Sequence, residues 1–152
     1  MKMKNTMLVV KDIKKSETFY WEILGLRTLV DLDIHAVLTG GLALQTEDSW
    51  KGFIAKDVTY TSNNTEIYFE EDNFDEFIAK LNAIKTIEYV HPVMEHSWGQ
   101  RVVRFYDPDY HIIEVGENMK NVCKRYLDMG MTLEEIAVKM EVPLKAVKSY
   151  AR

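Results

Sequence analysis

Trp98 to Val115, with the sequence WGQRVVRFYDPDYHIIEV, is the stretch that decides the fold, and it predicts a β-hairpin. Val102 to Tyr106 is rich in β-branched and aromatic residues, as strands are. Asp107-Pro108-Asp109 has turn chemistry, because proline fixes φ and the aspartates can accept bonds from nearby backbone N–H groups. Ile112 to Val115 would form the return strand. Its Glu114 must lie either on a solvated face or in a cavity with a partner, since side chains alternate along a strand.

Composition describes one globular domain. The chain has 152 residues, of which 47% are hydrophobic and 28% charged, enough to bury a core. A formal net charge of -5 argues against nonspecific nucleic-acid binding. No apolar run approaches the roughly 20 residues of a membrane span. The single cysteine, Cys123, excludes an internal disulfide framework and fits a reducing cytosol, so we expect a cytoplasmic protein.

The first half predicts the element order βαβββ. Asp12 is a good N-cap for a helix over 13–24, and Gly25 would end that helix. Strands are expected at 6–10, 26–32, 36–39 and 42–46. Residues 47–64 have little periodicity and are predicted to be a loop and a linker, of the kind that often serves as a lid or binding segment.

The same order returns in the second half. Asn73 is expected to cap a helix, with Glu76 completing a capping box. His91-Pro92 is expected to end a strand. The strands are predicted at 66–70, 87–90, 102–106 and 111–115. The two caps, Asp12 and Asn73, are 61 residues apart, and strand falls on strand at that offset, which indicates a duplicated unit.

The hairpin resembles the closing hairpin of the vicinal-oxygen-chelate superfamily, which includes glyoxalase I, extradiol dioxygenases and bleomycin-resistance proteins. The matching elements are Trp98-Gly99-x-Arg101, Asp107-Pro108-Asp109 and Glu114. The resemblance implies an α+β fold in which two βαβββ modules form a curved mixed sheet around a cavity. We place this domain at 1–117, with modules 4–60 and 64–117. The motif is specific for the fold and not for the reaction.

The resemblance also implies where a metal would bind. Carried over residue by residue, the four ligand positions of metal-using relatives fall on Asn5, Ala43, Glu66 and Glu114. Only Glu114 has the expected residue type, and Ala43 has no donor; a two-residue shift of the alignment would put Gln45 there instead. Oxygen donors alone suit a hard cation better than zinc. We therefore expect no tightly bound cofactor, and leave a divalent metal open.

Aromatic and polar residues near the expected cavity are candidate ligand contacts. Pockets are mostly apolar and aromatic side chains offer large contact areas. Trp50 and Trp98 lie in predicted loops, where a core role is less natural than it is for Tyr68. His96 precedes Trp98 at the expected cavity mouth. The predicted ligand-binding residues are Trp50, Tyr68, His96, Trp98 and Arg101, whereas Glu114 and Glu66 would be the catalytic residues of an enzyme.

Residues 118–152 lie outside the resemblance and predict three helices. The first would span 119–129, the second would begin at Thr132 with Glu135 as capping-box partner, and the third would follow Pro143. The spacing resembles a helix-turn-helix, although Glu141 stands where glycine is common in the turn. The helix at the recognition position, 144–152, offers cations but no evident set of base-reading side chains, so we expect this segment to serve structure or assembly.

Three functions compete. The favoured one is a binding protein that encloses a small organic ligand without a tightly held metal. The second is a metal-dependent lyase or dioxygenase, in which the metal would act as a Lewis acid and Glu66 or Glu114 as base. The third is a ligand-sensing DNA-binding regulator. Whether the chain is an enzyme is left open. The expected partners are a small ligand and a second copy of the chain, whereas nucleic acid and membrane are not expected.

Overall fold

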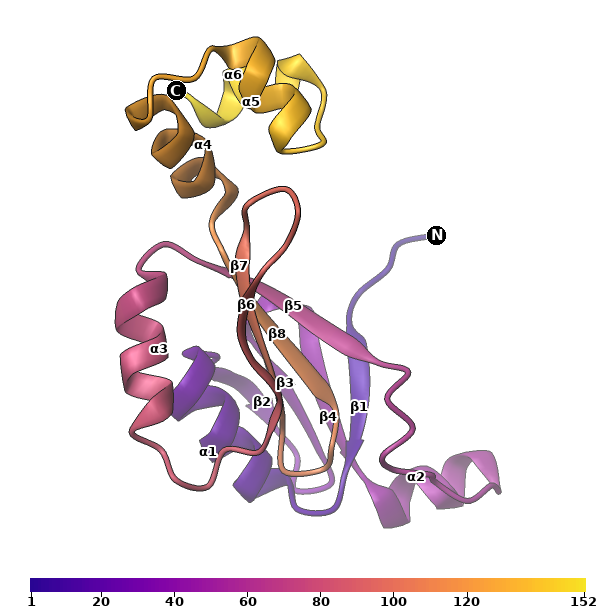
Figure 1. Ribbon diagram of the computed structural model, residues 1–152. Helices are drawn as coiled ribbons and strands as arrows, with labels where there is room; N and C mark the ends of the chain where they lie inside the picture. The colour runs from indigo at the N-terminus through magenta and orange to yellow at the C-terminus, as the bar shows by residue number, and fades with distance from the viewer. The chain divides into compact units, whose positions relative to one another are not determined.

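The computed structural model describes all 152 residues and confirms an α+β fold with two βαβββ arrangements and three C-terminal helices (Figure 1). The chain divides into two compact units. The first unit comprises Met1–Thr65 with Asp107–His111, and the second comprises Glu66–Tyr106 with Ile112–Arg152. No helix combines the length and the apolar character needed to cross a membrane. The two units are described separately below.

The first unit contains a four-stranded sheet and the helix α1. Its elements are β1 (Thr6–Val10), α1 (Ile13–Leu24), β2 (Thr28–Asp31), β3 (His35–Leu38), the 3₁₀ turn η1 (Thr39–Gly41) and β4 (Leu42–Thr46). The strand order is β1-β4-β3-β2, with β1 parallel to β4 and the other pairs antiparallel. As predicted, Asp12 caps α1 by accepting from Lys15 N, and Gly25 ends it with a φ of 69°. The buried residues Tyr20, Leu8 and Leu44 belong to its core.

The helix α2 (Glu47–Ile54) corrects the prediction of a loop from residue 47. It is only 8 residues long and contains Gly52, so the sequence shows little helical periodicity. Its first turn is acidic, which suits the positive end of the helix dipole. Lys51 Nζ pairs with Glu47 Oε1 at 2.6 Å, one helical turn away. The predicted loop character holds only for the residues between α2 and the second sheet.

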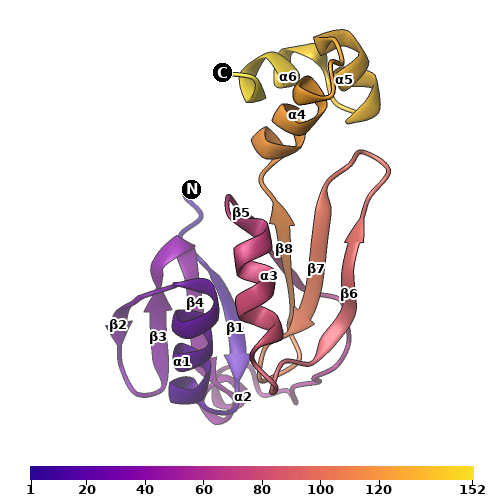
Figure 2. The same cartoon turned by 60° about the vertical axis from the view of Figure 1, so that its left-hand side comes forward.

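The second unit repeats the topology of the first. Its sheet elements are β5 (Glu66–Glu71), α3 (Phe74–Asn82), β6 (Tyr89–Glu95), β7 (Arg101–Tyr106) and β8 (Ile112–Glu117). The order β5-β8-β7-β6, with β5 parallel to β8, matches that of the first sheet and confirms the duplication (Figure 2). The predicted hairpin is the antiparallel pair β7–β8. Val103, Phe105, Ile113 and Val115 are all buried.

Two local predictions in this unit are wrong. Asn73 precedes α3, but its side chain makes no cap bond; its backbone N–H instead donates to Glu71 Oε1 at 2.7 Å. The expected capping box with Glu76 is therefore absent. Pro92 does not end a strand, because β6 runs through it. Since β6 is the edge strand and its register shifts between His91 and Met94, the missing N–H of proline is tolerated there.

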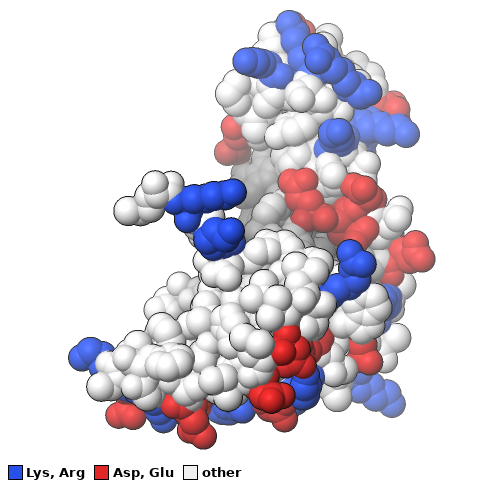
Figure 3. Space-filling model, turned by 180° about the vertical axis from the view of Figure 1, so that it is seen from behind, with Lys and Arg blue, Asp and Glu red and all other residues white.

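The C-terminal helices are α4 (Met119–Asp128), α5 (Leu133–Lys139) and α6 (Leu144–Tyr150). They share a core of buried residues: Val122, Cys123, Tyr126, Ile136, Met140 and Val147. Thr132 and Glu135 form the predicted capping box. Glu141, in the turn between α5 and α6, has a φ of 56°, a conformation that favours glycine. Lys and Arg side chains gather over these helices (Figure 3).

Candidate functional site

One face of the second sheet gathers polar side chains. The register sets Tyr68 on β5 opposite Glu114 on β8, which in turn lies opposite Arg104 on β7. Paired residues point to the same face of a sheet, and so do residues two apart on one strand. We call this group the polar face: Glu66, Tyr68, His91, Arg104 and Glu114. The residues that alternate with them on β7 and β8 form the apolar core on the opposite side.

Arg104 is the centre of the polar face. Its Nε donates to Glu66 Oε2 at 2.7 Å, and its Nη2 forms an ion pair with Glu114 Oε2. Its Nη1 lies 3.2 Å from His91 Nε2, while His91 Nδ1 lies 2.7 Å from the carbonyl of Pro92. A neutral His91 protonated on Nδ1 satisfies both contacts, because Nε2 then accepts from the guanidinium. One cation thus holds two carboxylates and one imidazole in place.

Glu114 is the buried member of the polar face, with 6% of its surface exposed. Burial raises the pKa of its carboxyl group, Arg104 opposes the rise, and the neighbouring carboxylate of Glu66 adds to it. Its Oε2 contacts Arg104 Nη2 and accepts no further hydrogen bond. A carboxylate oxygen can accept more than one hydrogen bond. The polar face therefore contains a buried acceptor with room for a second donor, which a ligand could supply.

The loop between β6 and β7 borders this face. We call His96–Gln100 the aromatic loop, because the rings of His96 and Trp98 stack with centroids 4.1 Å apart. Trp98 Nε1 donates to Gln100 Oε1 at 3.2 Å, and Gln100 Nε2 donates to the Tyr68 hydroxyl at 2.8 Å. Burial lowers the pKa of His96. Three of the predicted ligand contacts, Tyr68, His96 and Trp98, are thus brought together.

Arg101 is not brought to the same place. It lies on β7, three residues before Arg104, so its side chain points to the opposite face of the sheet. Its Nη1 donates to Asp75 on α3 at 2.7 Å, and its Nε donates to the buried carboxylate of Glu117 at 3.2 Å. Its guanidinium also lies over the ring of Phe74. The structure gives Arg101 contacts that join α3 to β8, on the side of the sheet away from Glu114.

The residues at the implied metal positions do not fit a firmly held cation. Glu66 and Glu114 both pair with Arg104, whose guanidinium already occupies the position next to each carboxylate. Ala43 lies at one of the other two positions and has no donor atom. Gln45, on the same face of β4, has its amide engaged by His35 Nδ1 at 2.8 Å and by Ser49. No group of three or more His, Cys, Asp or Glu side chains is placed to hold a metal ion.

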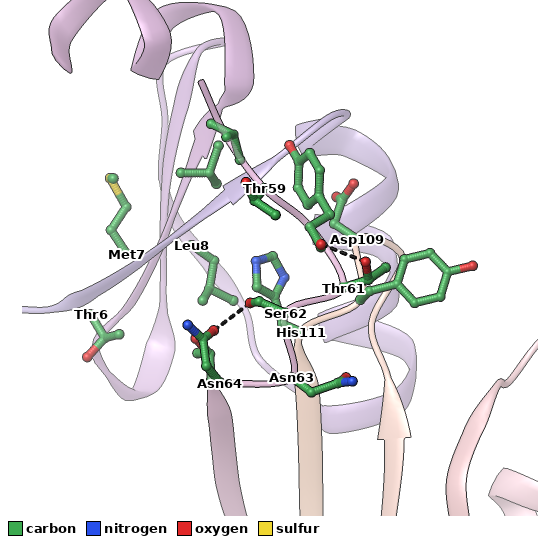
Figure 4. A pocket seen from close by; sticks show the side chains of 15 residues that line it. Thr6, Met7, Leu8, Thr59, Thr61, Ser62, Asn63, Asn64, Asp109 and His111 are labelled. Atoms are coloured by element: carbon green, nitrogen blue, oxygen red, sulfur yellow. Dashed lines mark hydrogen bonds between the residues drawn. The ribbon is translucent and has the colours of Figure 1, made fainter. Parts of the chain in front are cut away.

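The first unit contains a separate cavity of about 390 Å³. It lies between β1, the irregular segment Val58–Thr65 and the turn Asp109–His111. Figure 4 shows hydroxyl, amide and imidazole groups among its lining side chains, including those of Thr59, Ser62 and His111. Of the predicted site residues, none lines this cavity. Trp50 lies on α2, a helix rather than the predicted loop, and its pairing with Trp98 at one site stays a prediction.

His111 is held at this cavity by a buried carboxylate. Asp107 Oδ2 accepts from His111 Nδ1 and from the Tyr20 hydroxyl, each at 2.8 Å. Asp107 Oδ1 accepts from the backbone N–H groups of Asp109 and His111, each at 2.9 Å. His111 is not among the residues that the sequence predicted for a site. The spacing Asp107-Pro108-Asp109-x-His111 was the signal for this arrangement, because a turn there returns the imidazole to the first aspartate.

The fold with two four-stranded sheets is similar to that of a glyoxalase/bleomycin resistance protein/dioxygenase from Nocardioides, which is 19% identical, with 77% of this chain and 83% of that chain covered and a TM-score of 0.61. The chain belongs to the glyoxalase-like domain family, whose profile matches residues 3–120.

Solved structures agree with this membership. A protein of unknown function from Agrobacterium tumefaciens str. C58 is 33% identical, with 78% of this chain and 94% of that chain covered and a TM-score of 0.68. A glyoxalase-related enzyme from Fulvimarina pelagi is 19% identical, with 78% and 89% covered and a TM-score of 0.67. A lactoylglutathione lyase from Agrobacterium tumefaciens is 22% identical, with 78% and 94% covered and a TM-score of 0.60. The last two likenesses show the fold alone. A comparison with curated proteins returned no match.

Proposed function

We propose that this protein binds a small organic molecule at the polar face of the second sheet, beside the aromatic loop, without a tightly held metal. The observation that carries the proposal is the buried carboxylate of Glu114, whose Oε2 contacts Arg104 and accepts no further hydrogen bond. A ligand with an N–H or O–H group at this point would add a second bond, and a hydrogen bond to a charged acceptor is among the stronger polar contacts.

The neighbouring side chains narrow the kind of ligand. Tyr68, itself part of the polar face, is 47% exposed, so its ring and hydroxyl are accessible to a ligand. Trp98 offers an indole that already stacks on His96. A planar or apolar body against these rings, with a donor directed at Glu114, matches both the aromatic and the acidic character of the site. In this proposal Glu114 and Tyr68 bind the ligand, whereas His96 and Trp98 border it.

The alternative functions have weaker support. A metal-dependent lyase or dioxygenase would need Glu66 and Glu114 to release Arg104, and no observation favours that exchange. A DNA-binding regulator would need a reading surface on α6, where the sequence offers only dispersed cations. A second copy of the chain as partner, and a cytoplasmic location, are likewise proposals that come from the sequence.

The proposal is tested by titrating libraries of small organic compounds into the protein and following the amide and indole NMR signals. A true ligand moves the signals of Tyr68, Trp98 and Glu114. Glu114→Gln should then weaken it roughly 10- to 100-fold, the cost of losing a hydrogen bond to a charged group. Glu95→Gln, which removes an exposed carboxylate of β6, is the control. Equal affinity in both variants would remove Glu114 from the site.

Metal content is tested on the same preparation. Protein purified without a chelator and dialysed should retain no stoichiometric zinc, nickel or iron. If one of these metals is retained and Glu114→Ala abolishes the retention, the binding proposal gives way to the metal-dependent one.

A further inference from the structure

The aromatic loop touches the C-terminal helices on its outer side. Arg125 on α4 donates from Nη2 to the carbonyl oxygen of Gly99. Its Nη1 also lies 3.1 Å from each carboxylate oxygen of Glu117, a buried residue at the end of β8. Arg101 donates to the same carboxylate at 3.2 Å. Arg125 therefore joins the loop to a charge that is already fixed to the sheet.

Tyr126, the next residue on α4, fills the space beside Gly99. A Cβ atom at Gly99 would lie 1.8 Å from the Tyr126 hydroxyl and 2.7 Å from its Cζ, so no side chain fits there. Gly99 also has a φ of +88°, which L-residues rarely adopt. The backbone of the loop is thus in direct contact with a buried ring of the C-terminal core.

The end of α5 and the turn that follows it hold the loop at a second point. Lys139 Nζ donates to the carbonyl oxygen of Ser97 at 3.0 Å, and Ser97 Oγ donates to Glu141 Oε1 at 2.8 Å. These two contacts hold Ser97, the residue before Trp98. The contacts of Arg125 and Tyr126 hold Gly99, the residue after it. All of them come from residues beyond position 120, where the match to the glyoxalase-like family ends.

On its inner side the loop touches the polar face. Gln100 is 5% exposed, and its Nε2 donates to the carbonyl oxygen of Glu117 at 2.9 Å and to the Tyr68 hydroxyl at 2.8 Å. Its Oε1 accepts from Trp98 Nε1. A continuous set of contacts therefore runs from α4 through Gly99 and Gln100 to Trp98 and Tyr68.

We infer that the C-terminal helices position the aromatic loop, so that Arg125, Tyr126 and Glu141 are positioning residues for Trp98 at the ligand site. The helices act through the loop and do not touch the ligand themselves. The ligand part of this inference rests on the proposed function. The positioning part does not, because the placement of Trp98 can be measured without any ligand.

The experiment compares Arg125→Gln with Lys124→Gln in the full chain. Both substitutions remove one positive charge from α4, but Lys124 is exposed and does not contact the loop. Glu117 keeps Arg101 as its partner in both variants. The indole N–H signal of Trp98, assigned with Trp98→Phe, should shift and exchange faster with solvent in Arg125→Gln only. An unchanged Trp98 signal in folded Arg125→Gln would overturn the inference.

Glu141→Gly separates positioning from stability. It removes the contact with Ser97, yet glycine relieves the positive φ of Glu141. We expect a melting temperature that is unchanged or higher, together with a shifted and broadened Trp98 indole signal. A role of the helices in stability alone predicts no shift. This variant also decides the question if Arg125→Gln does not fold.

Ligand affinity then extends the test. A ligand found in the screen should bind Arg125→Gln and Glu141→Gly several-fold more weakly than Lys124→Gln. If Trp98 moves but affinity stays the same, the helices position the loop and the loop is not part of the ligand site. If no ligand is found, the proposed function fails while the positioning of Trp98 still stands or falls by its own signal.

Discussion

At the scale of single residues, the polar face depends on a carboxyl group whose pKa is raised by burial. Above the ordinary Glu pKa of 4.5 and below the raised pKa of Glu114, the folded state binds more protons at this site than the unfolded state. The free energy of unfolding therefore falls as pH rises through that window. Glu114→Gln cannot titrate, so it should lose less stability over the same range.

The measurement is the melting temperature of both proteins between pH 4.5 and neutrality. We expect the melting temperature of Glu114→Gln minus that of the wild type to increase with pH, because ionisation of the buried Glu114 carboxyl group destabilises the wild type. Glu88→Gln, on the exposed segment before β6, should follow the wild type. A difference that decreases with pH would mean that the attraction to Arg104 outweighs the cost of burying Glu114.

Asp107 is the residue that holds the turn between β7 and β8 together. Its side chain accepts four hydrogen bonds, from Tyr20, His111 and two backbone N–H groups. Asp107→Ala leaves these donors without a partner, and we expect a loss of roughly 3 kcal/mol in the free energy of unfolding. Tyr20→Phe removes one donor and leaves Asp107 with its other three hydrogen bonds, so it should cost about 1 kcal/mol in the free energy of unfolding. Urea unfolding of both variants checks the order, and equal losses would contradict it.

At the scale of elements, the sequence predicted what local chemistry dictates. Asp12 and Gly25 mark both ends of α1, and Thr132 with Glu135 marks the start of α5, because caps satisfy backbone groups of their own helix. The elements that were missed depend on more distant structure. Pro92 is allowed in β6 only because that strand is at the sheet edge, and α2 is too short to show a periodicity.

The α5 capping box can be tested directly. The backbone N–H of Thr132 donates to Glu135 Oε2 at 2.7 Å and the Thr132 hydroxyl donates to the same oxygen at 2.9 Å, and these two bonds, the backbone bond first, lower the pKa of the Glu135 carboxyl group. The Thr132 hydroxyl also accepts from Glu135 N. Thr132→Ala should lower the melting temperature at neutral pH. Alanine keeps the backbone N–H bond to Glu135 and loses the hydroxyl bonds. A depressed carboxyl pKa contributes stability that is lost as pH falls through it, so the part of the deficit that comes from the hydroxyl bond to the carboxylate should disappear in acid and the deficit should narrow. A deficit that stays constant down to the lowest pH would contradict this reading of the cap.

At the scale of the whole molecule, the sequence placed the candidate site only in part. Glu114, Glu66 and Tyr68 could be grouped because strand alternation and the duplicated order set them on one sheet. The contacts of Arg104 with Glu114, Glu66 and His91 depend on the register of β6, β7 and β8, which the sequence pattern does not set. Arg101 was assigned to the site because it belongs to the family motif. Arg101 and Arg104 are three residues apart on β7, so strand alternation alone puts their side chains on opposite faces of the sheet. The partners of Arg101, Asp75 on α3 and Glu117 on β8, depend on tertiary structure.

The C-terminal helices give the last prediction. Their core includes Tyr126, which packs on Gly99. The neighbouring residue on α4, Arg125, pairs with Glu117. Truncation after Glu117 removes both contacts and exposes the aromatic loop, so the melting temperature of the shortened protein should be lower. Removal of the exposed residues 151–152 alone should leave it unchanged. Calorimetry measures the melting, and sedimentation measures the mass. If truncation after Glu117 changed neither, the helices would contribute nothing to the stability or assembly of the chain, and their function would have to involve an external partner.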